Sequence, residues 1–430
     1  MKTFISLAFA SIFLATAAAT TATAEPVAII NATLHTGGGA GTVERGTLVM
    51  DGAKITAVGA GVPIPDGATI IDAGGAEVTP GFMNPYTHLG IVEIEQEGST
   101  DDSDSGEMPY KASLDIAPGL NPASVTIPVT RVKGVTRAAS VPDFSKSIFA
   151  GQAALLTLGD GEDFAVTPRA AMHVTVSEGA KRLIGAGRGA VMAMLRQAFD
   201  DTRYYARNRS DFDNNRARAT ALDRLDLEAL IPVVDGRMLL LVDARRASDI
   251  RNIIALATEQ KLKVALVNAE EAWMVAGELA AAKIPVIIDP SDNLPNRFEA
   301  LNATLQNAAR LHEAGVAVAF FAGGEQLANN PRNVRQLAGI AVANGLPKDA
   351  AYAALTTVPA AIWGIAERYG TLEPGKDADA VIWDGDPLEV TSAPTHVFIL
   401  GRPISLETRQ TKLRDRYRDL SGGGPGIGYR

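Results

Sequence analysis

The fold is decided by the stretch 238–267, which reads MLLLV at 238–242, ASDIRNIIALATEQ at 247–260 and KVALV at 263–267. The two outer segments are short and continuously apolar, which is typical of strands buried on both faces, and the middle one has the periodicity of a helix. A helical pattern at 270–282 and an apolar run at 285–288 continue the alternation. The stretch therefore predicts a parallel sheet covered by helices.

This alternation extends outward from Pro80 to about Glu367, and the two flanks differ from it. Short apolar runs separated by glycine turns precede it and return after Tyr369, which predicts strands in both flanks. Each flank is too small to bury a core alone, so we expect them to form one discontinuous β-sandwich. We place this sandwich at 25–80 plus 369–420, the α/β core at 81–368 and a flexible tail at 421–430.

The first 24 residues have the features of a secretory signal peptide. Lys2 supplies a positive start, an apolar run follows from Phe4 to Ala15, and Ala22-Thr23-Ala24 offers small residues for cleavage. A membrane anchor is the alternative, but the apolar run is short for a span. We predict export, to a bacterial periplasm, and no membrane-spanning segment.

Composition excludes some classes of function. The 430 residues carry a formal net charge of −9, and nucleic-acid binding requires clustered positive charge, so we expect no nucleic-acid partner. The chain has no cysteine, which removes disulfides, thiolate metal ligands and a cysteine nucleophile. Hydrophobic residues make up 47%, as in a globular protein with a substantial core.

Three motifs carry a resemblance to a known family. They read VTPGFMNPYTHLG at 78–90, ALTTVPA at 354–360 and YGTLEPGKDADAV at 369–381. Together they resemble the amidohydrolase superfamily, and EGAKR at 178–182 with DARRASDI at 243–250 is similar to its exported, imidazolonepropionase-like branch. The resemblance implies a TIM-type (β/α)8 barrel, its active site at the carboxyl ends of the strands, and a β-sandwich built from both termini.

The resemblance also implies one or two divalent metals, usually Zn²⁺, held by histidines and carboxylates. At the first barrel strand the family has His-x-His, whose spacing places both rings on one face. This chain has Tyr86-Thr87-His88. His88 stays a candidate metal ligand, with a hydrogen-bonded barrel histidine as the alternative. Tyr86 replaces the other ligand with a phenol of pKa about 10, a poor ligand at neutral pH.

The other family positions are altered as well. By alignment to the family, Asp243 is a candidate ligand, Arg245 brings a positive charge to a metal position, and Asn268 replaces a histidine. An ion pair between Asp243 and a neighbouring arginine is the alternative for that carboxylate. Gly323 replaces the catalytic aspartate, and Glu325 is the nearest possible substitute.

A count of histidines indicates, independently of the alignment, that most of the family's metal ligands are missing. The chain has five histidines, and of these only His88 and His173 fall where they would reach a barrel site. The other three are expected in the flanking strands or in a helix before the last barrel strand: His35, His312 and His396. We assign no cofactor, and Zn²⁺ remains a candidate.

Two functions stay open. The first is a hydrolase of carbon–nitrogen bonds in cyclic amides or small peptides, with reduced or no metal-dependent activity. The second is a non-catalytic pseudoenzyme that binds a small molecule, with Arg245 and Asn268 as donors, or that scaffolds an active relative. A homodimer or a dimer with an intact amidohydrolase is the expected assembly. No catalytic residue is assigned.

Overall fold

The computed structural model describes residues 25–109, 111–161, 164–324 and 326–418. The predicted signal peptide at 1–24, the predicted tail at 421–430 and Glu325 lie outside the described residues. In the part that is described, no helix is long and apolar enough to cross a membrane.

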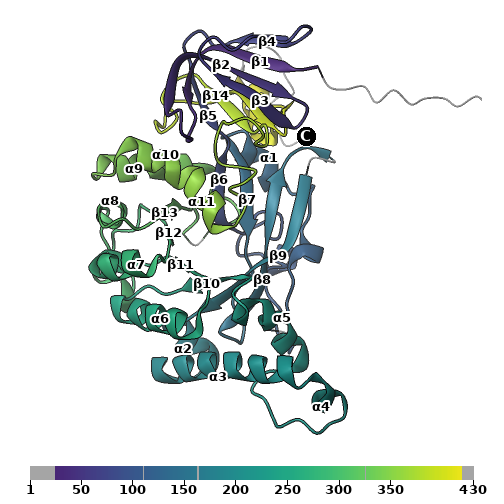
Figure 1. The fold of residues 1–430 in the computed structure, drawn as a ribbon, viewed down its shortest axis with the longest axis vertical. Helices are drawn as coiled ribbons and strands as arrows, with labels where there is room; N and C mark the ends of the chain where they lie inside the picture. Colours follow the sequence, from purple (N-terminus) through teal and green to yellow (C-terminus); the bar gives the residue numbers. More distant parts are fainter. Residues whose placement is uncertain (1–24, 110, 162–163, 325, 419–430) are drawn as a thin grey trace, which may run out of the picture.

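Two sheets organise the chain, and the larger body is a barrel (Figure 1). Neighbouring strands in its sheet are consecutive in the sequence, from β6 at one edge to β13 at the other. The barrel strands are β6 (Phe82–Thr87), β7 (Val135–Ser140), β8 (Phe149–Leu158), β9 (Phe164–Thr175), β10 (Leu239–Asp243), β11 (Val264–Val267), β12 (Val286–Ile288) and β13 (Val318–Phe320).

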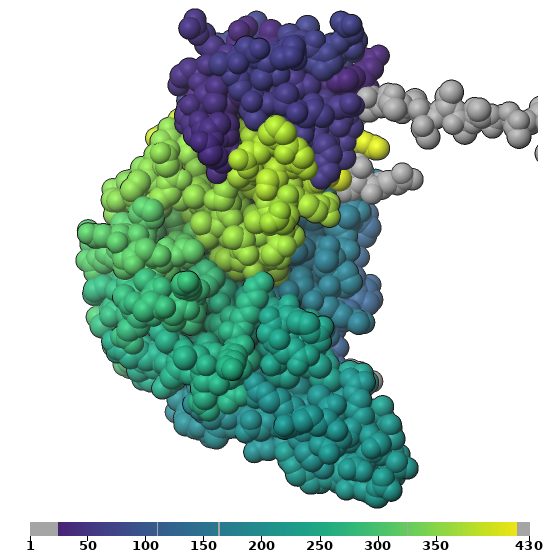
Figure 2. All heavy atoms as spheres, in the orientation of Figure 1, coloured from purple at the N-terminus to yellow at the C-terminus, as the bar shows by residue number. Residues whose placement is uncertain are grey.

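The second sheet comes from both flanks, as the sequence predicts, and the two ends of the chain meet where β5 pairs with β14. In Figures 1 and 2 the N-terminal and C-terminal segments lie against each other at one end of the molecule. The strands are β1 (Val27–His35), β2 (Thr42–Asp51), β3 (Lys54–Gly59), β4 (Thr69–Asp72), β5 (Glu77–Pro80), β14 (Ala380–Trp383), β15 (Pro394–Ile399) and β16 (Arg402–Pro403).

Helices cover the outside of the barrel sheet, and α3 lies at the end of the molecule opposite the terminal sheet (Figure 1). The helices are α1 (Thr126–Arg131), α2 (Glu178–Ile184), α3 (Arg188–Arg207), α4 (Arg209–Asp213), α5 (Arg224–Val234), α6 (Ala247–Gln260), α7 (Ala276–Ala282), α8 (Asn307–Glu313), α9 (Val334–Ala343), α10 (Lys348–Leu355), α11 (Thr357–Ile362) and α12 (Arg409–Arg418).

One barrel strand runs against the others. Strands β9 to β13 pair in parallel, and so do β6 and β7, but β8 pairs antiparallel with both β7 and β9. Antiparallel neighbours need no helical crossover. In agreement with this, the described residues between β7 and β9 contain no α-helix. The predicted α/β barrel with a terminal β-sandwich is thus confirmed, with this local departure from strict alternation.

Alternate residues of the barrel strands enter separate cores. Along β10, Leu239 and Leu241 pack inside the barrel, whereas Leu240 and Val242 pack outside it with the helices. Side chains of a strand point alternately to its two faces. The same alternation therefore directs Asp243, the last residue of β10, toward the barrel axis. The alternation along β10 therefore connects the apolar run in the sequence to Asp243, a candidate site residue.

The barrel closes between β6 and β13 through side chains and loop contacts. The ring of Tyr86, in β6, packs edge-on against Phe321 just beyond β13, with centroids 5.1 Å apart. The side-chain amide of Asn84 donates to the carbonyl of Ala322 at 3.4 Å. The backbone N–H of His88 donates to the carbonyl of Leu327 at 2.9 Å. These contacts bring Tyr86 and His88 to the carboxyl end of β13.

Candidate functional site

The candidate site lies at the carboxyl ends of the barrel strands. Asp243 ends β10, Asn268 follows β11, His88 follows β6 and Gly323 follows β13. Parallel strands present these ends on one side of a barrel, so residues distant in sequence meet there. Asn268 has a left-handed backbone with φ of 66°, as Ala269 does with 49°. This bend turns the chain from β11 across the mouth.

Asp243 is the centre of the contacts in this mouth. Its Oδ1 accepts a hydrogen bond from the amide of Asn268 at 2.8 Å, and the Nε of Arg245 lies 3.1 Å from the same oxygen. Its Oδ2 accepts from the hydroxyl of Thr175 at 3.1 Å. Burial acts to raise the pKa of Asp243, but the charge of Arg245 and the hydrogen bond from Asn268 outweigh it, so the pKa is lowered.

Arg245 is held by three carboxylates. Besides Asp243, its Nη1 donates to Oε1 of Glu270 at 2.5 Å, and its Nε lies 3.6 Å from Oε1 of Glu299. Burial acts to lower the pKa of this guanidinium, and the surrounding carboxylates raise it instead. Arg245 is therefore charged at every accessible pH. Its Nη1 and the amide of Asn268 donate hydrogen bonds inside the site, whereas its buried Nε has ion-pair contacts but no hydrogen-bond partner among the described residues.

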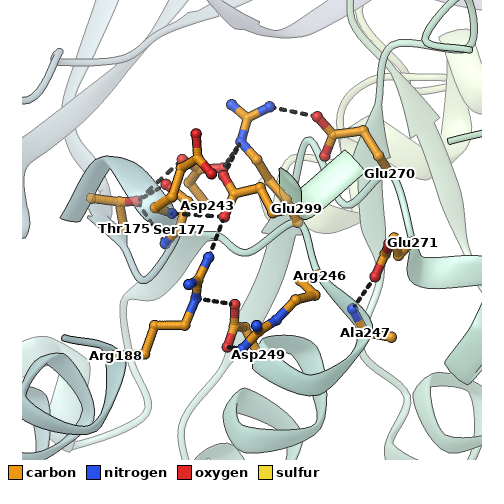
Figure 3. Close-up of polar contacts among 12 residues, drawn as sticks. Thr175, Ser177, Arg188, Asp243, Arg246, Ala247, Asp249, Glu270, Glu271 and Glu299 are labelled. Atoms are coloured by element: carbon orange, nitrogen blue, oxygen red, sulfur yellow. Dashed lines mark hydrogen bonds and ion pairs between the residues drawn. The ribbon is translucent and has the colours of Figure 1, made fainter. Parts of the chain in front are cut away.

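The network continues outward from Glu299 (Figure 3). Arg188, in α3, donates from Nη2 to Oε2 of Glu299 at 3.0 Å and from Nε to Asp249 at 2.8 Å. Asp249 also accepts from Arg246 at 3.0 Å. Each carboxylate in this network is thus paired with an arginine. These pairs link the loops after β10 and β12 to helices α3 and α6.

Tyr86 and His173 form a buried pair on the other side of the mouth. The Nδ1 of His173 lies 2.9 Å from the carbonyl of Pro142, which can only accept, so Nδ1 carries a proton. Nε2 of the neutral ring then accepts from the hydroxyl of Tyr86 at 3.5 Å. Burial lowers the pKa of His173 and raises that of Tyr86. Both side chains are consequently neutral at pH 7.

His88 lies close to this pair. Its side chain is 8% exposed, and burial lowers its pKa although Asp143, Glu95 and Asp101 act in the opposite direction. His88 and His173 are near enough for each charge to affect the other. The structure therefore brings together His88, His173, Tyr86 and the Asp243 cluster within one buried region. The remaining histidines lie elsewhere, in β1, α8 and β15: His35, His312 and His396.

Leu327 crowds the position that a side chain at residue 323 would take. A Cβ built there would lie 2.4 Å from Cδ2 of Leu327 and 3.2 Å from its Cα. Leu327 is held in turn, because its carbonyl accepts from His88. A carboxylate at 323 would require the Leu327 side chain to rotate and its backbone to shift by a few tenths of an ångström. Glu325, the substitute considered from sequence, lies outside the described residues.

Two further carboxylates at the mouth were not apparent from sequence. Asp289, just after β12, accepts from the backbone N–H and the hydroxyl of Ser291 at 2.9 and 2.5 Å. Burial, with the charges of Asp289 and Glu270, raises the pKa of Asp292 to about 7. Glu299 was missed too, because it lies in an irregular loop with no motif. Asp289, directly after the apolar run at 285–288, and Glu270, three residues after β11, had a positional signal.

Comparison with known proteins finds a family domain in part of the chain. Residues 236–406 match the amidohydrolase family. The amidohydrolase tasK of Hapsidospora irregularis is 26% identical over 392 residues, which cover 84% of this chain and 39% of that protein. This chain thus spans less than half the length of that relative.

Solved structures agree over most of the chain. An amidohydrolase from Thermotoga maritima MSB8 superposes with a TM-score of 0.79 at 26% identity, covering 88% of this chain and 99% of that one. An adenosine deaminase from Xanthomonas campestris with bound zinc has a TM-score of 0.53 at 18% identity, covering 91% and 98%. Residues 236–406 therefore carry an amidohydrolase family domain, and the chain as a whole has the amidohydrolase fold.

Proposed function

We propose that this chain is a non-catalytic member of the amidohydrolase superfamily, in which an ion-pair network takes the place of a metal centre. The observation that carries the proposal is the position of Arg245. Its Nε lies 3.1 Å from Asp243, the one carboxylate at a family ligand position. A permanent positive charge at this distance repels a divalent cation. The guanidinium neutralises the carboxylate that a metal would otherwise use.

The donors at the mouth do not fit a divalent metal. Within the described ranges, no group of three or more histidine, aspartate or glutamate side chains is placed to hold one. Both oxygens of Asp243 are engaged by Thr175, Asn268 and Arg245. His173 uses one ring nitrogen on a carbonyl and the other on Tyr86. A metal would have to break these contacts before it gained ligands.

The test is metal content together with turnover. We expect the purified chain to hold far less than one zinc per molecule, and to show no hydrolysis of cyclic amides or dipeptides that depends on added zinc. As a matched gain-of-function control, the triple variant Tyr86→His, Arg245→His, Asn268→His should bind zinc more tightly than the parent chain. Stoichiometric zinc with metal-dependent turnover in the unmodified chain would refute the proposal.

A weak hydrolase of carbon–nitrogen bonds is the second candidate, and the Tyr86–His173 pair favours it. A neutral imidazole that accepts from a buried phenol is a potential proton acceptor near the barrel axis. This candidate requires turnover that persists in EDTA and is abolished by His173→Ala. Turnover that survives this substitution would assign the activity to a contaminant or to another site.

Three finer proposals rest on sequence. The segments at 178–182 and 243–250 support the imidazolonepropionase-like branch, and the features of 1–24 support export to a periplasm. Cell fractionation with N-terminal sequencing tests export, since a start at residue 25 in the periplasmic fraction is expected.

A dimer, with a second copy or with an intact amidohydrolase, is the proposed assembly. Co-purification from the native host followed by mass spectrometry tests the mixed form.

A further inference from the structure

A cavity of 570 Å³ lies at the end of the barrel opposite the mouth. Its walls include the starts of three neighbouring strands, at Leu239, Val264 and Pro285. Because the candidate site lies at the carboxyl ends of these strands, the cavity is separated from it by the length of the barrel. The volume lies within the range of about 300–1,000 Å³ that is usual for small-molecule sites.

Helix α11 forms the other wall of this cavity. It contributes Val358, Ala361 and Ile362, and these face the apolar strand starts across the space. Ile362 also packs with the residues that fill the barrel interior. The helix therefore closes the amino end of the barrel and leaves an apolar space beside it, in which a hydrocarbon chain would be removed from water.

Two lysines stand at the border of this apolar space. Lys263 precedes β11 and Lys283 follows α7, and both side chains are exposed and line the cavity. Among the described residues, neither ammonium group has an ion-pair or hydrogen-bond partner. Acidic side chains outnumber basic ones in the whole chain, 49 to 40. The Nζ of Lys263 lies 4.0 Å from the point where a Cβ on Gly364, just after α11, would be placed.

We propose that this cavity binds a small amphipathic anion, a free medium-chain carboxylate, with its hydrocarbon chain against α11 and its head group between Lys263 and Lys283. The apolar walls can contact the hydrocarbon chain of the ligand, and two unpaired ammonium groups carry the charge complementary to its carboxylate. The site is remote from the barrel mouth and does not depend on the function proposed for it.

Titration calorimetry with decanoate, below its critical micelle concentration, tests this site. Decyltrimethylammonium is the matched probe, because it has the same chain and the opposite head-group charge. We expect decanoate to bind at least about tenfold more tightly than the cation. The two lysines attract the carboxylate of decanoate and repel the quaternary ammonium group. Equal affinities, or no binding of decanoate, would overturn the proposal.

Two variants locate the binding. Lys263→Glu with Lys283→Glu should weaken decanoate binding about tenfold or more and strengthen binding of decyltrimethylammonium. Ala361→Phe, at an exposed position of α11, should obstruct the cavity and weaken both probes. Decanoate affinity that is unchanged in either variant would place its binding elsewhere and refute the site.

The control is Lys261→Glu, which makes the charge change of one of the two substitutions, two residues from Lys263, at a lysine that lines a different cavity. It should leave decanoate binding within about twofold. An equal loss in this control would show that only the general charge of the surface matters, which contradicts a specific site. Analytical ultracentrifugation of the same samples adds a further outcome: a dimer that excludes decanoate would identify the cavity as an interface and overturn the proposal.

Discussion

At the scale of single residues, the barrel mouth is controlled by one guanidinium. Arg245 forms ion pairs with Asp243 and Glu270, and its Nε lies 3.6 Å from Glu299. The side chains of these three acids are at most 9% exposed, so each would be costly to leave unpaired. The arginine is thus as much a structural element as a replacement for a ligand.

Removing this charge should destabilise the fold. Arg245→Met leaves a cluster of buried carboxylates without their cation, and we expect the free energy of unfolding to fall by about 3–5 kcal/mol. Urea denaturation followed by circular dichroism measures it. The control is Arg251→Met, since Arg251 and Glu278 form a half-exposed pair whose loss costs about 0–1 kcal/mol. Similar losses in the two variants would contradict the assigned role of Arg245.

Asp292 should make stability depend on pH. Its pKa is raised to about 7, whereas an unfolded aspartate has a pKa of about 3.9. Between these values the native state holds a proton that the unfolded state has lost, so this group's stabilising contribution is complete below pH 4 and is lost as the pH rises through 7.

Asp292→Asn removes this dependence, and it should therefore gain stability relative to the unmodified chain between about pH 4 and pH 7. Urea titrations at several pH values measure the difference between the two proteins. The control Asp66→Asn, at an exposed loop position, should show a difference that does not change over the same interval. A difference that shrinks with rising pH would contradict the assignment.

At the scale of elements, a buried arginine that pairs with both Asp377 and Asp379 joins the barrel to the terminal sheet. Arg137, in β7, donates from Nε to Oδ2 of Asp379 at 2.8 Å and from Nη2 to Oδ1 at 3.2 Å. Asp379 directly precedes β14 and also accepts from the backbone of Leu400 at 2.9 Å. A two-point contact of this kind sets the orientation of one sheet against the other.

We expect Arg137→Met to lower the free energy of unfolding by about 3–5 kcal/mol and to reduce cooperativity, because the two sheets lose their shared ion pair. Urea unfolding followed by both tryptophan fluorescence and circular dichroism tests this, and the two transitions should separate. Lys146→Met, which removes an exposed pair with Glu107, serves as the control and should change little. Coincident transitions with full stability would disprove the coupling.

At the scale of the whole molecule, the fold should be independent of metal. A ligand that binds only the native state raises its stability, by about 2.7 kcal/mol at one hundred times its dissociation constant. If the ion-pair network replaces the metal, EDTA and added zinc should each leave Tm unchanged within about 1 °C. Differential scanning fluorimetry measures this, with a zinc-bound amidohydrolase as positive control. A clear fall of Tm in EDTA would contradict the proposal.

The sequence by itself determined the architecture, because strand and helix patterns are local and the barrel and terminal sheet follow from their order. It also identified Tyr86, His88, Asp243, Arg245 and Asn268 as residues at strand ends, since period-two alternation and the family motifs depend only on neighbours in the chain. The reversed direction of β8 was not apparent, because direction depends on which strand an apolar run pairs with.

What only the tertiary structure decided is the partnership of those residues. That Arg245 pairs with Glu270 and approaches Glu299, that Leu327 fills the space beside Gly323, and that Tyr86 meets His173 all depend on loops from different strands meeting at one end of the barrel. Burial then sets the energies, since the same charges on a surface would be solvated and nearly independent. The change from a possible metal ligand to an arginine-bound carboxylate is therefore a property of the folded mouth.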